Sequence, residues 1–160
     1  MIILGIDPGT TAIGCAIVEA GTPPRLLHAE LLPIRSHDPA DRLRELHAGL
    51  EALIRTWRPS IASVEKIFFA ANTKTAIAVA QARGVILLTA ALRGITVVEY
   101  APREIKKALT GDGSADKQQM KKMVILTLPE TATLRASDDV FDAIASALAC
   151  CFQEKLHLRG

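Results

Sequence analysis

The chain has few aromatic residues, few cysteines and almost no net charge. Phenylalanine, tryptophan and tyrosine make up 4% of its 160 residues, and the formal net charge is +2 at pH 7. The cysteines are Cys15, Cys150 and Cys151. Two of them are adjacent and their number is odd, which fits neither a disulfide framework nor a zinc site. We therefore interpret them as small core residues of a cytosolic protein.

Long hydrophobic runs are also missing. The apolar stretches are interrupted by charges well before they reach the length that spans a bilayer. Met1 leads directly into an apolar run, without the basic segment that opens a signal peptide. Hydrophobic residues nevertheless make up 49% of the chain, which is enough for a folded core. We expect a cytoplasmic protein without membrane association, folded as a single domain over residues 1–160.

Strand-like and helical runs follow one another in an order that predicts the fold class. The predicted strands are residues 2–7, 13–19, 25–34, 61–67 and 96–100. The predicted helices are, approximately, residues 39–57, 72–93, 102–110, 116–128 and 138–155. Short turns join the first three strands into an antiparallel meander, whereas helical crossovers make the last two strands parallel to the first. The sequence thus predicts an α/β protein with a mixed five-stranded sheet and helices on both faces.

Asp7 closes the first apolar run and opens the turn sequence Asp7-Pro8-Gly9. The run before it is continuous rather than alternating, which is typical of a strand buried on both faces. A carboxylate at the end of such a strand is costly to desolvate, so it is either hydrogen-bonded by its own turn or bound to a cation. Ligand sites in sheets of this kind lie beyond the carboxyl ends of the parallel strands, where Asp7 is predicted to be.

Two further groups of acids are predicted to reach the same edge. Glu65 lies toward the end of the strand beside the first, where the alternative is a solvent-facing residue paired with a base. Asp138, Asp139 and Asp142 crowd the first turns of the last helix, where acids also serve as caps. Residues 143–151 are small and apolar, which predicts close packing of this helix. The pattern alone leaves open whether Asp138 or Asp139 joins Asp142.

Carboxylates gathered in one place repel one another unless a cation binds between them. Ligation by oxygen alone favours Mg²⁺ or Mn²⁺, and two such ions about 4 Å apart form a clamp for in-line phosphoryl chemistry. Between Arg103 and Lys122, six basic side chains stand against three acidic ones, which indicates either a solvated helical face or a phosphate-binding surface. We predict two Mg²⁺ ions per subunit, for which Mn²⁺ substitutes, and a substrate with a polyphosphate backbone.

Five segments together resemble the RuvC family of Holliday junction resolvases. They are Ile3-Leu4-Gly5-Ile6-Asp7-Pro8-Gly9, Val64-Glu65-Lys66-Ile67-Phe68, Gln81-Ala82-Arg83-Gly84, Gly113-Ser114-Ala115-Asp116-Lys117 and Asp139-Val140-Phe141-Asp142-Ala143. Their order and spacing are similar to those of the family from residue 2 to about residue 152. The resemblance implies a ribonuclease H-like fold and a homodimeric endodeoxyribonuclease. It also implies paired symmetric nicks in four-way DNA junctions during recombination and repair, in association with the branch-migration proteins RuvA and RuvB.

The resemblance implies roles for individual residues as well. The catalytic and metal-binding acids are expected to be Asp7, Glu65, Asp139 and Asp142, since the family pattern in the last helix is Asp-x-x-Asp-Ala. Asp138 is an added acid outside that pattern, interpreted either as a helix cap or as a support for metal binding without direct ligation. Phe68 matches an aromatic residue that acts on bases near the crossover, with its neighbour Phe69 as the alternative.

Lys106 and Lys117 match the family's basic residues near the scissile phosphates. The DNA-binding residues that we predict are Phe68, Phe69, Asn72, Lys74, Arg83, Arg103, Lys106, Lys107 and Lys117. A dimer is also predicted from the residues themselves, because the helix over residues 75–92 is apolar on nearly all sides. One face can cover the sheet while another meets a second copy; the alternative is a central helix in a monomer.

Three other functions share parts of this pattern. The segment from Gly5 to Thr11 also resembles the first phosphate loop of the actin, chaperone and sugar-kinase superfamily, but 160 residues are too few for its two domains. An inert nucleic-acid-binding module of the same fold is the second alternative, and the retained carboxylates argue against it. A ribonuclease H-like nuclease that cuts RNA in hybrid duplexes is the third, which the pattern distinguishes only through the aromatic pair, the basic loop and the predicted dimer.

Overall fold

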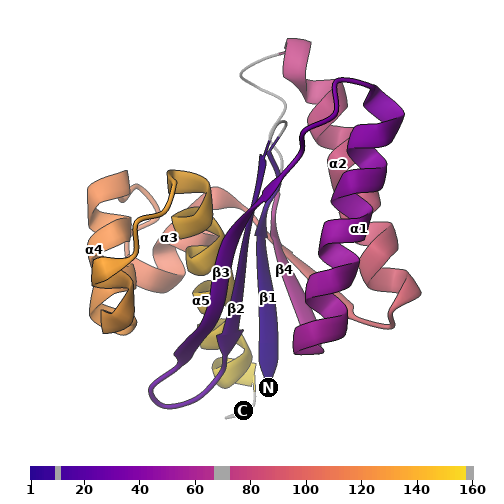
Figure 1. The fold of residues 1–160 in the computed structure, drawn as a ribbon. Helices are drawn as coiled ribbons and strands as arrows, with labels where there is room; N and C mark the ends of the chain where they lie inside the picture. Colours follow the sequence, from indigo (N-terminus) through magenta and orange to yellow (C-terminus); the bar gives the residue numbers. More distant parts are fainter. Residues whose placement is uncertain (10–11, 67–72, 158–160) are drawn as a thin grey trace.

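The computed structural model describes residues 1–9, 12–66 and 73–157, in which a five-stranded sheet lies between two groups of helices (Figure 1). The strands are β1 (Ile2–Asp7), β2 (Ala12–Glu19), β3 (Arg25–Pro33), β4 (Ile61–Glu65) and β5 (Thr96–Tyr100). Their order across the sheet is β3-β2-β1-β4-β5. The pairs β1–β2 and β2–β3 are antiparallel, whereas β1–β4 and β4–β5 are parallel, which confirms the predicted mixed sheet.

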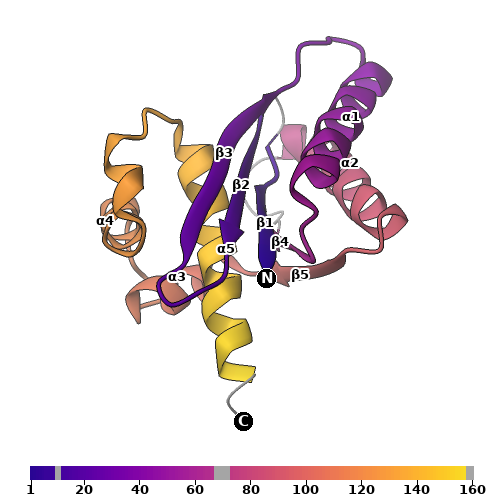
Figure 2. The same ribbon diagram turned by 60° about the horizontal axis from the view of Figure 1, so that its bottom comes forward.

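Helices cover both faces of this sheet. On one face lie α1 (Pro39–Trp57) and α2 (Thr73–Leu92) (Figure 1). On the other lies α5 (Asp138–His157), with α3 (Pro102–Thr110) and α4 (Lys117–Thr127) outside it (Figure 2). A short 3-10 helix, η1 (Pro129–Thr133), follows α4. In the part of the chain that the structure describes, no helix is long and apolar enough to cross a membrane.

The sheet face under α5 has a glycine at each of the two points where the helix backbone comes closest to β1 and β2. A Cβ atom on Gly5 would lie 2.1 Å from the backbone oxygen of Ala143, and a Cβ atom on Gly14 would lie 2.0 Å from that of Asp139. Both distances are far below van der Waals contact, so glycine alone permits the helix backbone to lie directly on β1 and β2. This close approach holds the first turn of α5 near the carboxyl end of β1.

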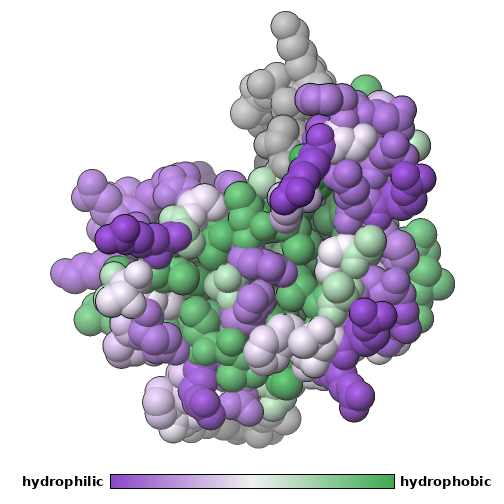
Figure 3. Space-filling model, viewed as in Figure 1, coloured by the Kyte–Doolittle hydropathy of each residue, from purple (hydrophilic) through white to green (hydrophobic). Residues whose placement is uncertain are grey.

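The opposite face is covered by large aliphatic side chains. Leu46 and Leu50 of α1 and Ile86 of α2 are each 1% exposed, and they belong to one core cluster with Leu4 and Ile6 of β1. Burying each such side chain stabilises the fold by about 1.5–3 kcal/mol. The outer sides of α1 and α4 are mainly hydrophilic, with hydrophobic residues visible over the sheet between them (Figure 3).

Local sequence sets the ends of α3 and α4, which carry the basic stretch. Pro102 begins α3, and Gly111 ends it with a φ of 80°, a left-handed conformation that suits glycine. Asp116 caps α4, because its Oδ1 accepts a hydrogen bond from the backbone nitrogen of Gln119 at 2.8 Å. Gln119 Oε1 accepts in return from the backbone nitrogen of Asp116, also at 2.8 Å. These reciprocal bonds make Lys117 the first residue of α4.

The structure moves the ends of several predicted elements by one or two residues and adds one short helix. β4 ends at Glu65 rather than at residue 67. The Lys66 backbone nitrogen still donates to the oxygen of Tyr100 at 2.8 Å, and Ile67 lies outside the described residues. Pro129 stops α4 as predicted but then begins η1, which the sequence did not predict, because proline suits the first turn of a helix. α5 continues to residue 157, two residues beyond its predicted end.

Candidate active site

Asp7 lies at the carboxyl end of β1 and faces α5. Side chains alternate along a strand, so Ile3, Gly5 and Asp7 share the sheet face that α5 covers. Asp7 is paired with Gly14 across the β1–β2 ladder. Because Gly14 admits the backbone of Asp139 so closely, the first turn of α5 is held beside Asp7.

Glu65 is brought to the same edge by the parallel pairing of β1 and β4. Ile6 of β1 is aligned with Val64 of β4, so the next residues, Asp7 and Glu65, end neighbouring strands. In a parallel pair the carboxyl ends of both strands lie on the same side of the sheet. The predicted convergence of these two acids is therefore a consequence of the strand register.

Asp142 is placed over Glu65 by two buried serines. Ser63 Oγ is 2.8 Å from the carbonyl oxygen of Ser146, and Ser146 Oγ is 3.2 Å from that of Ser63, with both residues fully buried. Glu65 lies two residues beyond Ser63 on the same face of β4. Asp142 lies four residues before Ser146 on the same face of α5. The serine contact that locks α5 to β4 thus also brings the two carboxylates together.

The four predicted acids act on one another electrostatically. Burial, together with the charges of neighbouring acids, raises the pKa of Asp7 to about 7. Those neighbours are Glu65, Asp142 and Asp139. Burial and the charge of Asp142 raise the pKa of Glu65 to about 7 as well, and burial also raises the pKa of Asp142. We call these four residues, which come from β1, β4 and α5, the carboxylate cluster.

The chemistry of the carboxylate cluster fits a divalent cation bound by oxygen. All four side chains offer hard carboxylate oxygens, the ligands that Mg²⁺ and Mn²⁺ prefer. Over residues 1–9, 12–66 and 73–157, no three Asp, Glu, His or Cys side chains are gathered closely enough to enclose a metal ion. Ionised carboxylates that act on one another in this way repel. A cation among them would offset that repulsion, and its ligands would be Asp7, Glu65, Asp139 and Asp142.

Two lysines reach the carboxylate cluster from α3 and α4. Glu65, Lys106, Lys117 and Asp142 line one cavity together with apolar residues of α3, α4 and α5. The positive charges of both lysines oppose the effect of burial, so they limit the rise in the pKa values of Glu65 and Asp142. The structure therefore brings the two predicted phosphate-binding lysines to the predicted metal-binding acids.

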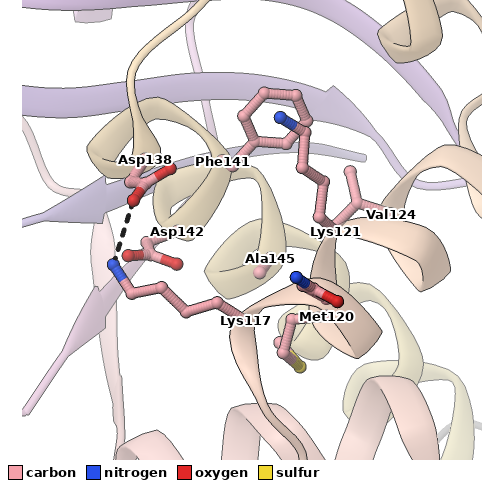
Figure 4. Close-up of a pocket in the computed structure, with 9 residues that line it drawn as sticks. Lys117, Met120, Lys121, Val124, Asp138, Phe141, Asp142 and Ala145 are labelled. Atoms are coloured by element: carbon pink, nitrogen blue, oxygen red, sulfur yellow. Dashed lines mark hydrogen bonds and ion pairs between the residues drawn. The ribbon is translucent and has the colours of Figure 1, made fainter.

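A second cavity adjoins the first, between α4 and the start of α5 (Figure 4). Lys117 Nζ donates to Asp138 Oδ2 at 3.2 Å, and Lys121 Nζ lies 4.5 Å from the centre of the Phe141 ring. The sequence reasoning missed both contacts because it considered the lysines of α4 as ligands of phosphate and not as partners of α5. The spacing of four residues between the two lysines, which puts them on one helix face, is the signal that could have suggested a shared partner.

Arg83, a predicted DNA-binding residue, is paired with Glu99. Its Nε and one terminal nitrogen donate to the two carboxylate oxygens of Glu99, each at 2.7 Å. This two-pronged geometry ties α2 to β5, and the hydrogen bond raises the pKa of Arg83. The sequence reasoning missed Glu99, although an acid inside an apolar strand is a signal for a buried or half-buried partner. A DNA-binding role for Arg83 stays a prediction.

The remaining predicted DNA-binding residues fall into two groups. Arg103 and Lys107 are exposed on α3, the helix that also carries Lys106. Outside what the structure describes lie Phe68, Phe69, Asn72 and the side chain of Lys74.

The chain matches known proteins along nearly its whole length. The family described as crossover junction endodeoxyribonuclease RuvC matches residues 3–151. The RuvC protein of Thermomicrobium roseum is 43% identical over 154 residues, which cover 96% of this chain and 93% of the relative. That of Moorella thermoacetica is 45% identical over 152 residues, covering 92% and 89%.

Solved structures agree with the sequence relatives. The RuvC of Thermus thermophilus superposes with a TM-score of 0.90 at 32% identity, covering 98% of this chain and 97% of that one. Its structure in complex with a Holliday junction substrate also gives a TM-score of 0.90, at 34% identity and with 98% and 96% covered. These likenesses confirm the predicted ribonuclease H-like fold. The chain therefore belongs to the RuvC family of crossover junction endodeoxyribonucleases.

Proposed function

We propose that this chain is a metal-dependent, structure-selective endodeoxyribonuclease that resolves four-way DNA junctions by paired symmetric nicks. The observation that carries the proposal is the carboxylate cluster, whose four acids come from three elements and act on one another. The relative from Thermus thermophilus is solved with a Holliday junction substrate, which supports the same substrate here. The reaction is hydrolysis of a phosphodiester bond during recombination and DNA repair.

The acids and the lysines have separate tasks in this reaction. The carboxylate cluster holds two Mg²⁺ ions per subunit, for which Mn²⁺ substitutes, because all its ligand atoms are oxygens. Ions held by these four acids would activate a water and stabilise the leaving oxygen. Lys106 and Lys117 line the cavity beside Glu65 and Asp142, so their ammonium groups bind the phosphate that is cut.

A second copy of the chain supplies the second cut, because a four-way junction has near two-fold symmetry and so does a dimer. Ile77, Leu88 and Leu92 of α2 are 72%, 58% and 69% exposed, and helical spacing puts them on one face. Gly84 lies between them, with open space where its Cβ would be. We propose this face of α2 as the dimer contact, since exposed apolar patches of this kind mark interaction surfaces.

The wider setting follows from the family. We propose that residues 1–160 act as one domain and work with the RuvA and RuvB branch-migration proteins. The relatives described above are bacterial, and bacterial chromosomal DNA lies in the cytoplasm, so the proposed site of action is cytoplasmic. Beyond Lys106 and Lys117, the proposed DNA contacts are Phe68, Phe69, Asn72, Lys74, Arg83, Arg103 and Lys107.

One cleavage experiment tests the proposed activity. The purified protein is offered, with Mg²⁺ or Mn²⁺, a four-way DNA junction, a linear duplex made of its arms, and an RNA–DNA hybrid of the same length. We expect symmetric cuts in the junction alone. Equal cutting of junction and duplex would contradict structure selectivity, and preferred cutting of the hybrid would favour a ribonuclease.

Asp7→Asn separates catalysis from binding in the same experiment. The variant is expected to lose cleavage by about a thousandfold or more, because it removes a proposed metal ligand at the centre of the carboxylate cluster. Junction binding without metal should be retained or improved, since the basic residues are untouched. A variant that still cut at the wild-type rate would remove Asp7 from the mechanism.

The dimer has a test with a matched control. Leu88→Glu places a charge on the proposed contact and is expected to convert the dimer to a monomer, read by light scattering on a sizing column. Leu126→Glu changes an equally exposed leucine, 63% exposed on α4, and should leave the mass unchanged. A wild-type protein that is monomeric at all concentrations, or a Leu88→Glu variant that stays dimeric, would refute this contact.

A further inference from the structure

Helix α4 rests on the first turn of α5 through two lysines spaced one turn apart (Figure 4). Lys117 reaches Asp138 at 3.2 Å, and Lys121 lies over Phe141, 4.5 Å from the ring centre. Phe141 is 6% exposed, so this second contact sits on a side chain fixed in the core. Met120 and Val124 of α4 are buried in the same core cluster as Phe141, so α4 is fixed against α5 and Lys117 extends from it toward the acids.

The ion pair between Lys117 and Asp138 contributes little to folding. The two side chains are 76% and 70% exposed, and water screens pairs of this kind. The pair instead holds the ammonium group of Lys117 in one position. A lysine side chain has many rotamers, and an ammonium without a partner samples many positions.

Lys117 lies within reach of more acids than it binds. Its charge opposes the rise in the pKa values of Asp7, Glu65 and Asp142, all of which belong to the carboxylate cluster. Its hydrogen bond, however, goes to Asp138, the one acid at the start of α5 that lies outside the cluster. An ammonium that moved onto the cluster would compete with a divalent cation for the same carboxylate oxygens.

We propose that Asp138 is a positioning residue for the nuclease reaction, which holds the ammonium of Lys117 at the rim of the carboxylate cluster. The inference rests on the proposed function, in which Lys117 binds the phosphate that is cut. Asp138 acts through Lys117 in two ways. It keeps the ammonium near the place where the phosphate arrives, and it keeps the ammonium off the oxygens that bind metal.

The single variant Asp138→Asn tests the effect on the reaction. At saturating junction, its cleavage rate in a single turnover is expected to fall about threefold to fivefold, the most that an exposed ion pair of this kind supports. Junction binding without metal should be unchanged or tighter, because a negative charge near the phosphate is removed. Asp138→Glu, which restores the carboxylate, should recover most of the rate. Equal rates for Asp138→Asn and the wild type would overturn the proposal.

A matched control removes a similar ion pair elsewhere. Asp41 is also an acid in the first turn of a helix, and its Oδ1 lies 2.8 Å from a terminal nitrogen of Arg44 on α1. Asp41→Asn is expected to leave both cleavage and junction binding unchanged. Unequal stability is checked by thermal unfolding of both variants. If Asp41→Asn slowed cleavage as much as Asp138→Asn, the effect would be one of general charge, and the positioning role would be refuted.

Coupling to Lys117 distinguishes positioning from a direct role. In a Lys117→Ala background, Asp138→Asn should slow cleavage by less than about twofold, because the residue through which it acts is gone. An equal loss in both backgrounds would show that Asp138 acts independently and would overturn the proposal.

Calorimetric titration of the free protein with Mg²⁺ gives a readout without DNA or catalysis. Asp138→Asn is expected to weaken Mg²⁺ binding about threefold when Lys117 is present and less when it is alanine. If Asp138 were itself a ligand, the loss would exceed tenfold in both backgrounds, which would refute the proposal. A wild-type protein that cut no junction would overturn the proposed nuclease, and the titration would still measure the coupling between Asp138 and Lys117.

Discussion

The two faces of the sheet are covered in different ways. On the α5 face, Gly5 and Gly14 let the helix backbone lie directly on the strands. On the α1 and α2 face, the side chains of Leu46, Leu50 and Ile86 fill a thicker layer between helix and sheet. The first arrangement leaves no room for adjustment, whereas large aliphatic side chains can shift to other rotamers at modest cost.

The tightly packed face is the one that carries the carboxylate cluster. The carboxylate cluster depends on the position of one helix end relative to two strand ends, and backbone contact fixes that position most tightly. The α1 and α2 face carries no residue of the cluster. Its helices only have to bury apolar surface on one side, and α2 exposes further apolar side chains on the other. Tight packing is therefore found where the fold must place charges, and ordinary packing where it must only exclude water.

Gly14→Ala is expected to have the largest effect, because it disrupts the close packing of α5 on the sheet. The new Cβ would lie 2.0 Å from the backbone oxygen of Asp139, so α5 must move away from β2. We expect the free energy of unfolding to fall by about 3 kcal/mol or more, at the upper end of overpacking effects. Cleavage should be lost as well, because the displaced turn carries an acid of the cluster. Chemical denaturation and junction cleavage measure the two effects. Wild-type stability in this variant would show that α5 is not held by backbone contact.

Asp7→Asn should stabilise the metal-free protein at high pH while it abolishes activity. Burial and neighbouring acids raise the pKa of Asp7 from 3.8 to about 7, so ionising it works against folding. We expect a gain on the order of 2–4 kcal/mol at pH 8, since each pKa unit corresponds to about 1.4 kcal/mol. Urea unfolding in the presence of a chelator measures this gain. A neutral or destabilising effect would mean that the site tolerates the charge without a metal ion.

The pH dependence of this gain has a defined sign. Below the unfolded pKa of 3.8 the carboxyl group is protonated in both states, and wild type and Asp7→Asn should be equally stable. As the pH rises, the unfolded chain releases its proton first, which favours unfolding of the wild type. The gap between the two proteins should therefore grow until the pH passes about 7 and stay constant above it. A gap that shrank with pH would contradict the raised pKa.

Ser146→Ala tests the contact that sets α5 against β4. It removes a buried hydroxyl that donates to the carbonyl oxygen of Ser63 at 3.2 Å. Losing a buried hydrogen bond of this kind costs about 1–2 kcal/mol. Ser60→Ala is the matched control, because Ser60 Oγ donates to the carbonyl oxygen of Ile2 at the same distance but is exposed. We expect a loss below about 0.5 kcal/mol for the control, and equal losses would mean that burial of the serine pair is unimportant.

The fold could be predicted almost completely because its signals are local. The continuous apolar run of β1, the short turns of the meander and the two helical crossovers each identify their element within a few residues. Boundaries that depend on tertiary contacts were missed. β4 ends at Glu65, where its register with β5 ends, and η1 puts Thr131 in a buried position just after Pro129.

The convergence of the acids could be predicted only in part, because part of it depends on tertiary contacts. Asp7 and Glu65 follow from strand ends in a parallel pair, which sequence order reveals. Asp138 and Asp139 lie in the same first turn of α5, and only the family pattern Asp-x-x-Asp-Ala, not the chemistry of the residues, separates them. Their surroundings differ in the structure: the backbone of Asp139 lies against Gly14, whereas the side chain of Asp138 binds a lysine of α4. Gly14 and Asp139 are more than a hundred positions apart in the sequence, and Lys117 and Asp138 are 21 positions apart.

Gly49→Ala is expected to have the smallest effect, and it tests the packing of the sheet face that α1 and α2 cover. A Cβ on Gly49 of α1 would lie 3.2 Å and 3.3 Å from the two terminal carbons of Leu32, a flexible side chain rather than backbone. Alanine gains about 0.5–1 kcal/mol over glycine inside a helix, and the tight contact offsets part of that gain. We expect the free energy of unfolding to change by less than about 1 kcal/mol and cleavage to stay at the wild-type rate. At Gly14 the same substitution meets backbone instead. Comparing the losses in the free energy of unfolding of the two variants therefore shows how differently the two faces accommodate a methyl group. A loss at Gly49 as large as that at Gly14 would show that both faces are equally rigid, and the placement of the acids would then need another explanation.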